Sequence, residues 1–155
     1  MAARTLLLSI RPKFAHKIFM GEKTMELRRT RPNVQAGDWA LVYVSSPRKA
    51  IFGAFEIADL IESSPEGLWS KAELSAAVTA EQYADYLIGA HRAFGICIRR
   101  VKRFVRPVSL AELRLHIPGF HPPQSYRYLT SMEMDRAGIE SPGCGSSLFN
   151  GTIAA

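Results

Sequence analysis

Three charged residues at close spacing stand out in the segment 21–28, which reads Gly-Glu-Lys-Thr-Met-Glu-Leu-Arg. Lys23, Glu26 and Arg28 fall within an alternation of polar and apolar residues that is typical of a half-buried β-strand. A lysine beside a carboxylate in a partly desolvated cleft can bind phosphate or carry a proton, whereas an exposed ion pair contributes little stability. The spacing therefore predicts a functional site at a sheet edge. A structural set of ion pairs is the alternative, and Arg28 fits that alternative best.

A second group of candidates flanks the turn 44–48, which reads Val-Ser-Ser-Pro-Arg. Single-stranded nucleic acids are bound by aromatic rings that stack on bases and by cations that neutralise the neighbouring phosphates. Tyr43 could supply the ring, and Arg48 and Lys49 the cations. The alternatives are that Tyr43 fills the core and that Lys49 is only solvated.

The third group follows the prolines at positions 122 and 123, which give a rigid base from which side chains can be aimed. Ser125 is expected to cap a helical turn over 126–129 through its hydroxyl. At the rim of a cleft its backbone amide could also donate to a phosphate. Arg127 adds a cation to the same rim.

Familiar metal and nucleophile motifs are absent from the sequence. The four histidines show no metal-ligand spacing, and neither do Cys97 and Cys144, which are expected to be reduced thiols, with Cys97 in the core. No resident metal or cofactor is predicted. A divalent ion such as magnesium is possible, with Glu26 as its ligand.

Charge is unevenly distributed along the 155 residues, whose net charge is +6. Residues 1–49 carry a net +7, residues 50–90 a net −6 and residues 91–155 a net +5. If the two basic ends meet in the fold they form one basic face, which suits a polyanionic partner. No apolar run is long enough to span a membrane, so we expect a cytoplasmic protein without a membrane partner.

Hydrophobic periodicity predicts a single α+β domain over 1–155. Its elements would form a small mixed β-barrel with surrounding helices, because the strands follow one another too closely for a doubly wound sheet. A helical insert is expected at about 63–90, and the Gly/Ser-rich stretch 138–155 has no assignment. The predicted strands are 5–10, 23–29, 39–44, 50–61 and 93–105, and the predicted helices are 12–20, 65–75, 79–90 and 109–114.

The pattern Gly21-x-Lys23-x-x-Glu26-x-Arg28, after a strand and a helix and before Gly37-Asp38, resembles the signature of the ASCH domain (activating signal cointegrator homology). The resemblance covers about 6–55 and, less specifically, 125–129. It implies a PUA-like β-barrel with a cleft between barrel and helices that holds RNA or a nucleoside. Members of the family include RNA-binding modules, ribonucleases and an amidohydrolase that acts on an acylated cytidine.

The function expected from these features is binding and cleavage of single-stranded RNA in a basic cleft. Lys23, Lys49 and Tyr43 would supply cations and a proton donor, and Glu26 a base or a ligand for a divalent ion. A non-catalytic RNA-binding module is the first alternative. The amidohydrolase is the second, because the hydroxyl residue that appears to act with the lysine three positions earlier in that enzyme is replaced here by Glu26. No protein partner is inferred.

Overall fold

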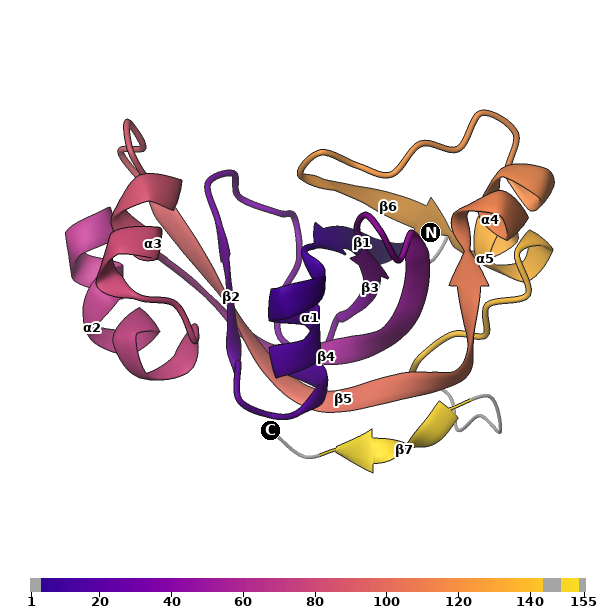
Figure 1. Ribbon diagram of the computed structural model, residues 1–155, viewed down its shortest axis with the longest axis horizontal. Coiled ribbons are helices and arrows are strands. Elements are labelled where there is room, and N and C mark those ends of the chain that lie inside the picture. Colours follow the sequence, from indigo (N-terminus) through magenta and orange to yellow (C-terminus); the bar gives the residue numbers. More distant parts are fainter. Residues whose placement is uncertain (1–3, 144–148, 154–155) are drawn as a thin grey trace.

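The computed structural model describes residues 4–143 and 149–153 (Figure 1). Strands and helices alternate irregularly along the chain. In order they are β1 (Arg4–Ile10), α1 (Pro12–Phe19), β2 (Met25–Arg28), β3 (Trp39–Val44), β4 (Ala50–Ser63), α2 (Pro65–Ser75), α3 (Ala80–Tyr86), β5 (Ala93–Ser109), α4 (Leu110–His116), β6 (Tyr126–Thr130), α5 (Ser131–Arg136) and β7 (Phe149–Ile153).

All seven of these strands join one mixed sheet, in the order β2-β5-β4-β3-β1-β6 with β7 paired to β5. The β1–β3 pair is parallel, and the other pairs are antiparallel. The long strands β4 and β5 shift register three times along their ladder. Such irregularities bend strands, and both strands curve strongly in Figure 1. The predicted α+β class with a curled, barrel-like sheet is confirmed.

Most helix ends follow the sequence signals that predicted them, but α3 ends at Tyr86 and not at the predicted residue 90. Pro12 occupies the first turn of α1, and Gly21 follows the helix with a φ of 80°, a conformation that glycine adopts without steric cost. The side chain of Thr79 accepts a hydrogen bond from the backbone amide of Gln82, and the side-chain oxygen of Gln82 accepts one from the backbone amide of Thr79. Ser109 caps α4 as predicted.

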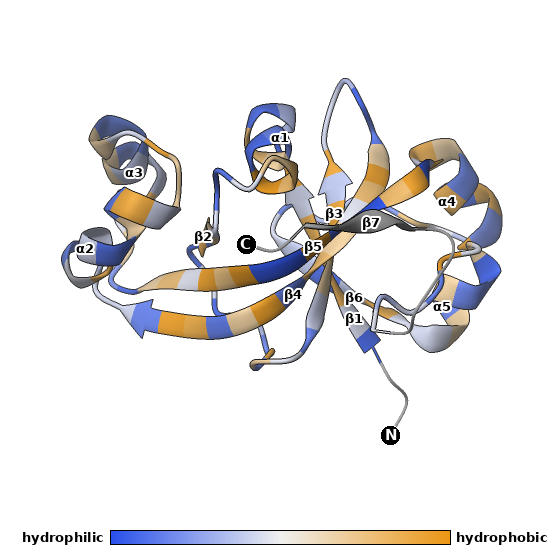
Figure 2. Cartoon of the chain, turned by 90° about the horizontal axis from the view of Figure 1, so that it is seen from below, coloured by the Kyte–Doolittle hydropathy of each residue, from blue (hydrophilic) through white to orange (hydrophobic). Residues whose placement is uncertain are grey.

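The core divides into three clusters of buried side chains. The first lies between the sheet and α1, the second covers the opposite sheet face under α4 and α5, and the third lies under the insert of α2 and α3. Hydrophobic residues run along both β4 and β5 (Figure 2). Gly53 allows α1 to approach β4 closely, because a Cβ atom there would collide with the Phe19 ring and the Lys102 carbonyl.

Three expectations need correction or completion. The segment 126–129, predicted as a helical turn, belongs to strand β6, which pairs antiparallel with β1. Its aromatic residues alternate with polar ones, a pattern that suits a strand. Cys97 is only half-buried, at the margin of the third cluster, and Cys144 lies outside the described residues.

None of the helices in the described ranges is both long and apolar enough to cross a membrane.

Candidate functional site

A cavity of about 640 Å³ opens between β2, α1 and α3. In both Figure 1 and Figure 2 strand β2 lies between the two helices, so they form opposite walls. Lys23, Glu26 and Arg28 form the floor, together with Ser9 from β1. The remaining polar and aromatic residues of the lining are Arg11, Phe14, Gln82, Tyr83, Asp85, Tyr86 and Gln124.

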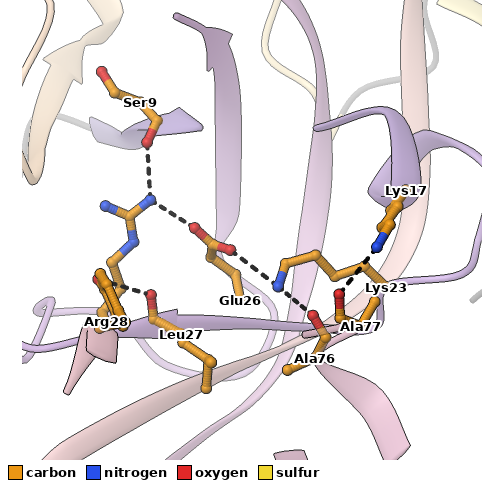
Figure 3. Close-up of polar contacts among 9 residues, drawn as sticks. Ser9, Lys17, Lys23, Glu26, Leu27, Arg28, Ala76 and Ala77 are labelled. Carbon is orange, nitrogen blue, oxygen red and sulfur yellow. Dashed lines mark hydrogen bonds and ion pairs between the residues drawn. The ribbon is translucent and has the colours of Figure 1, made fainter. Parts of the chain in front are cut away.

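Glu26 is held between two cations at the floor of this cavity (Figure 3). Its Oε2 atom accepts a hydrogen bond from Arg28 Nη2 at 2.7 Å, and its Oε1 atom lies 3.6 Å from Lys23 Nζ. Lys23, Glu26 and Arg28 are only 2%, 7% and 5% exposed. The structure thus brings together the three residues that the spacing singled out and buries them as one charge cluster.

Lys23 also joins β2 to the C-terminus of α2. Its Nζ atom donates to the Ala76 carbonyl oxygen at 2.5 Å, and Lys17 Nζ donates to the Ala77 carbonyl oxygen at 3.2 Å. Helix α2 has no basic residue in its own last turn, so these ammonium groups supply the positive charge that a helix C-terminus favours. Burial lowers the pKa of Lys23, and the Glu26 carboxylate opposes that shift.

Arg29 makes the equivalent connection to α3. Its Nη1 atom donates to the carbonyl oxygens of Tyr86 and Ile88, each at 2.8 Å. The Tyr86 hydroxyl donates in the opposite direction, to the Leu27 carbonyl oxygen at 3.2 Å. Both helices of the insert are therefore tied to the motif strand, which positions α3 as a wall of the cavity.

Arg28 connects the floor to the barrel. Its Nη2 atom also donates to the Ser9 carbonyl oxygen at 3.1 Å, and its Nη1 atom donates to the Ser125 carbonyl oxygen at 2.8 Å. The planar guanidinium can satisfy several acceptors in fixed directions, which an ammonium group cannot do. Through Arg28, the loop that carries Gln124 and Ser125 is held against the cavity.

Ser125 itself is exposed and precedes a strand, so it caps no helix. The predicted capping role is wrong for this reason. Arg127 points to a different neighbourhood: its Nη2 atom lies 3.1 Å from Glu133 Oε2, and its guanidinium lies 5.1 Å from the centre of the Phe120 ring. Arg127 does not line the cavity.

Tyr43 lies in the second core cluster and is 2% exposed. Its register partner in β1 is Ser9, which lines the cavity, but Tyr43 does not. A ring buried to this extent has no face left for a base, so the stacking role assigned to Tyr43 is corrected. Burial raises the pKa of its hydroxyl, and Arg114 opposes that shift.

The turn with Arg48 and Lys49 lies beside the cavity without lining it. Ser45 donates its backbone amide to the carbonyl oxygen of Ile10, a lining residue, at 3.0 Å. Arg48 and Lys49 are both exposed, and Lys49 has a φ of 52°. The turn is thus linked to the cavity lining through Ser45, whereas the carbonyl oxygen of Lys49 accepts a hydrogen bond from the Leu110 amide at the start of α4, at 2.9 Å.

Several lining residues were not predicted as site residues. Gln82, Asp85 and Tyr86 come from α3, where the capping box and helical spacing revealed a helix but not its partner. Arg11 and Phe14 come from the beginning of α1. The available signal was their position directly before the motif strand, which places α1 at the same site.

Comparisons with known proteins agree with this arrangement. The sequence profile of the ASCH domain matches residues 8–96. A protein of Zymomonas mobilis subsp. mobilis named ASCH domain-containing ribonuclease is 30% identical over 129 residues, which cover 83% of this chain and 86% of the relative.

Solved structures give the same result. The crystal structure of ASCH from Zymomonas mobilis superposes with a TM-score of 0.80 at 29% identity, covering 85% of this chain and 92% of that one. A mutant of that protein in which a serine is replaced by alanine also gives 0.80, at 28% identity, with 85% and 92% coverage. The chain therefore belongs to the ASCH domain family.

Proposed function

We propose that this protein binds single-stranded RNA in the cleft and cleaves its phosphodiester bonds. The observation that carries the proposal is a carboxylate held between two cations on the floor of a cavity. The likeness to a relative named as a ribonuclease, over most of both chains, supports it. The function therefore follows from the chemistry of the floor together with the family.

Phosphodiester cleavage needs a proton acceptor, stabilisation of charge at phosphorus and a proton for the leaving oxygen. In the proposed mechanism Glu26 accepts the proton of the attacking hydroxyl. Lys49 and Arg48 neutralise the phosphate from the neighbouring turn, and Arg28 holds Glu26 in place. Lys23 protonates the leaving oxygen, since burial lowers its pKa and so makes the ammonium a stronger acid.

A divalent ion does not fit at Glu26. Both carboxylate oxygens already face a cation, Lys23 on one side and Arg28 on the other, and these charges repel a metal ion. Within the described ranges, no three side chains of the types His, Cys, Asp and Glu converge on one point. The mechanism above therefore contains no step through a metal.

A second candidate is RNA binding without cleavage. It is favoured by the fact that both groups proposed to transfer protons already have hydrogen-bond partners within the protein. Glu26 accepts from Arg28, and Lys23 donates to the Ala76 carbonyl oxygen. If these bonds persist when RNA is bound, the cleft binds the strand but transfers no proton.

A gel assay with the purified protein separates the two functions. End-labelled single-stranded RNA is incubated with the wild type and with Glu26→Gln, in magnesium and in EDTA, with double-stranded RNA and single-stranded DNA as parallel substrates. Cleavage of single-stranded RNA in both buffers, lost in Glu26→Gln, supports the proposal. A retarded but intact strand supports the binding module instead, and cleavage only with magnesium contradicts the metal-free mechanism.

A further inference from the structure

Phe14 has an unusual set of neighbours on the α1 wall of the cavity. The ammonium groups of Lys13, Lys17 and Lys23 lie 5.9, 5.9 and 5.1 Å from the centre of its ring. A cation within about 6 Å of a ring centroid is attracted to the ring. Phe14 is half-buried, packs against the first core cluster and lines the cavity. One partly accessible ring thus lies among three positive charges.

The three lysines differ in how their charge is compensated. Lys23 faces Glu26 and the Ala76 carbonyl, and Lys17 donates to the Ala77 carbonyl. Lys13 is exposed and, within residues 4–143, no carboxylate pairs with Lys13 or with Arg11. Lys13 therefore carries uncompensated charge beside Phe14, whereas on the floor the single Glu26 carboxylate is shared by the two cations Lys23 and Arg28.

We infer that Phe14 and Lys13 bind one nucleotide of the RNA strand, with the base stacked on the ring and its phosphate on the ammonium group. The inference rests on the proposed RNA-binding function and names the substrate contact on the α1 wall. Stacking on an aromatic ring combined with cations along the backbone is the usual mode of single-strand binding. Because every base has a π-face, this contact binds all four bases.

The opposite wall is consistent with a flat ligand. Tyr86 lines the cavity from α3, and α3 lies on the other side of β2 from α1, the helix that carries Phe14 (Figure 1). Its hydroxyl is bonded to the Leu27 carbonyl, which fixes the orientation of the ring. A base on Phe14 would therefore enter a space bounded by aromatic side chains, above a floor on which the Glu26 carboxylate offsets one of the two positive charges of Lys23 and Arg28. The phosphate remains beside Lys13.

The test compares Phe14→Leu, Phe14→Tyr and Lys13→Ala in equilibrium binding to a fluorescein-labelled 12-nucleotide RNA. His16→Ala, an exposed residue of the same helix that does not line the cavity, is the matched control. We expect Phe14→Leu to weaken binding roughly 5- to 150-fold, the range of one lost stacked base, and Phe14→Tyr to keep wild-type affinity. Lys13→Ala should reduce the slope of log K against log salt concentration by about 0.7.

Failure of the inference and failure of the proposed function give different results. Wild-type affinity of a folded Phe14→Leu, or a slope unchanged by Lys13→Ala, overturns the inference while RNA binding stands. If Phe14→Leu does not fold, an RNA in which the bases are replaced by abasic sites decides: equal affinity for that strand and for the intact one removes the stacking. A wild type that binds without cleaving refutes only the catalytic proposal, and a wild type that binds no RNA refutes both.

Discussion

The ammonium of Lys23 donates to the carbonyl oxygen of Ala76 at 2.5 Å and so fixes the end of α2 to the motif strand. A backbone hydrogen bond joins the same two segments, because the Thr24 amide donates to the Ser75 carbonyl oxygen at 2.8 Å. The signature lysine therefore has two functions in this fold: it lies at the floor of the cavity, and it holds the insert that forms one wall.

Replacing Lys23 with methionine tests the second function. The Ala76 carbonyl loses its hydrogen-bond partner, at a cost of about 1–3 kcal/mol. Methionine carries no charge, so the desolvation cost of the buried ammonium group disappears and offsets part of that loss. We expect a net loss of about 1 kcal/mol in the free energy of unfolding. Hydrogen exchange should accelerate most in residues 75–88, measured by mass spectrometry.

Lys71→Met is the matched control, since Lys71 is an exposed lysine of α2. Unchanged exchange of residues 75–88 in Lys23→Met would show that the insert does not depend on this bond.

Glu26→Gln keeps the size of the side chain and removes its charge. Two buried cations, Lys23 and Arg28, then lose their charge partner, and breaking a buried pair costs about 3–5 kcal/mol. We expect the free energy of unfolding, measured in urea, to fall by this amount. If Glu26 is also the general base, cleavage per folded molecule falls roughly 100-fold or more. Activity that declines only in proportion to the folded fraction would exclude the catalytic role.

Glu26→Asp provides the comparison, because it keeps the charge and withdraws it by one methylene. We expect Glu26→Asp to be closer to the wild type in stability than in cleavage rate. A general base must reach the proton that it accepts, whereas an ion pair tolerates a small change in distance.

Lys49→Ala removes an exposed cation of the turn between β3 and β4, which is proposed to bind phosphate. A lysine on a phosphate is indifferent to base identity, so binding should weaken by the same factor for poly(U), poly(A) and mixed strands. The salt slope should fall by about 0.7. Arg136→Ala is the control, because Arg136 is an exposed arginine of α5, on the sheet face opposite to α1. A loss confined to one base type would contradict a phosphate contact.

The elements of this fold could largely be predicted from local signals. The proline at position 12, Gly21 and the serine and threonine caps each determine a helix end through backbone chemistry within a few residues. The charged motif was also predictable as a candidate site, because the alternation placed three ionisable residues in or beside one half-buried strand.

The walls of the site could not be predicted in the same way. Phe14 and Tyr86 read as ordinary apolar positions of amphipathic helices, and only the tertiary placement of α1 and α3 makes them part of a cavity lining. Tyr43 illustrates the opposite error. Its place at a strand end suggested a cleft residue, but the alternation in β3 directs it into the core under α4 and α5. Strand periodicity gives two faces and does not say which face is covered.

Tyr43→Phe examines what remains of the role assigned to that hydroxyl. Burial raises the pKa of Tyr43 above its ordinary value of 10.0. A group with a raised folded pKa contributes stability that is fully present below the unfolded pKa and is lost as the pH rises through the folded pKa. The wild type should therefore lose stability above pH 10 more steeply than Tyr43→Phe, as measured by thermal unfolding between about pH 8 and 11.

The same variant decides whether this hydroxyl takes part in cleavage. Because the Tyr43 side chain is buried outside the cavity lining, we expect Tyr43→Phe to cleave and bind RNA at close to the wild-type rate and affinity. A fall in the cleavage rate of roughly 100-fold with unchanged binding would instead identify the hydroxyl as the proton donor, because a lost general acid typically costs that much. In that case Tyr43 must become accessible to the strand when RNA binds, although it is buried in the free protein.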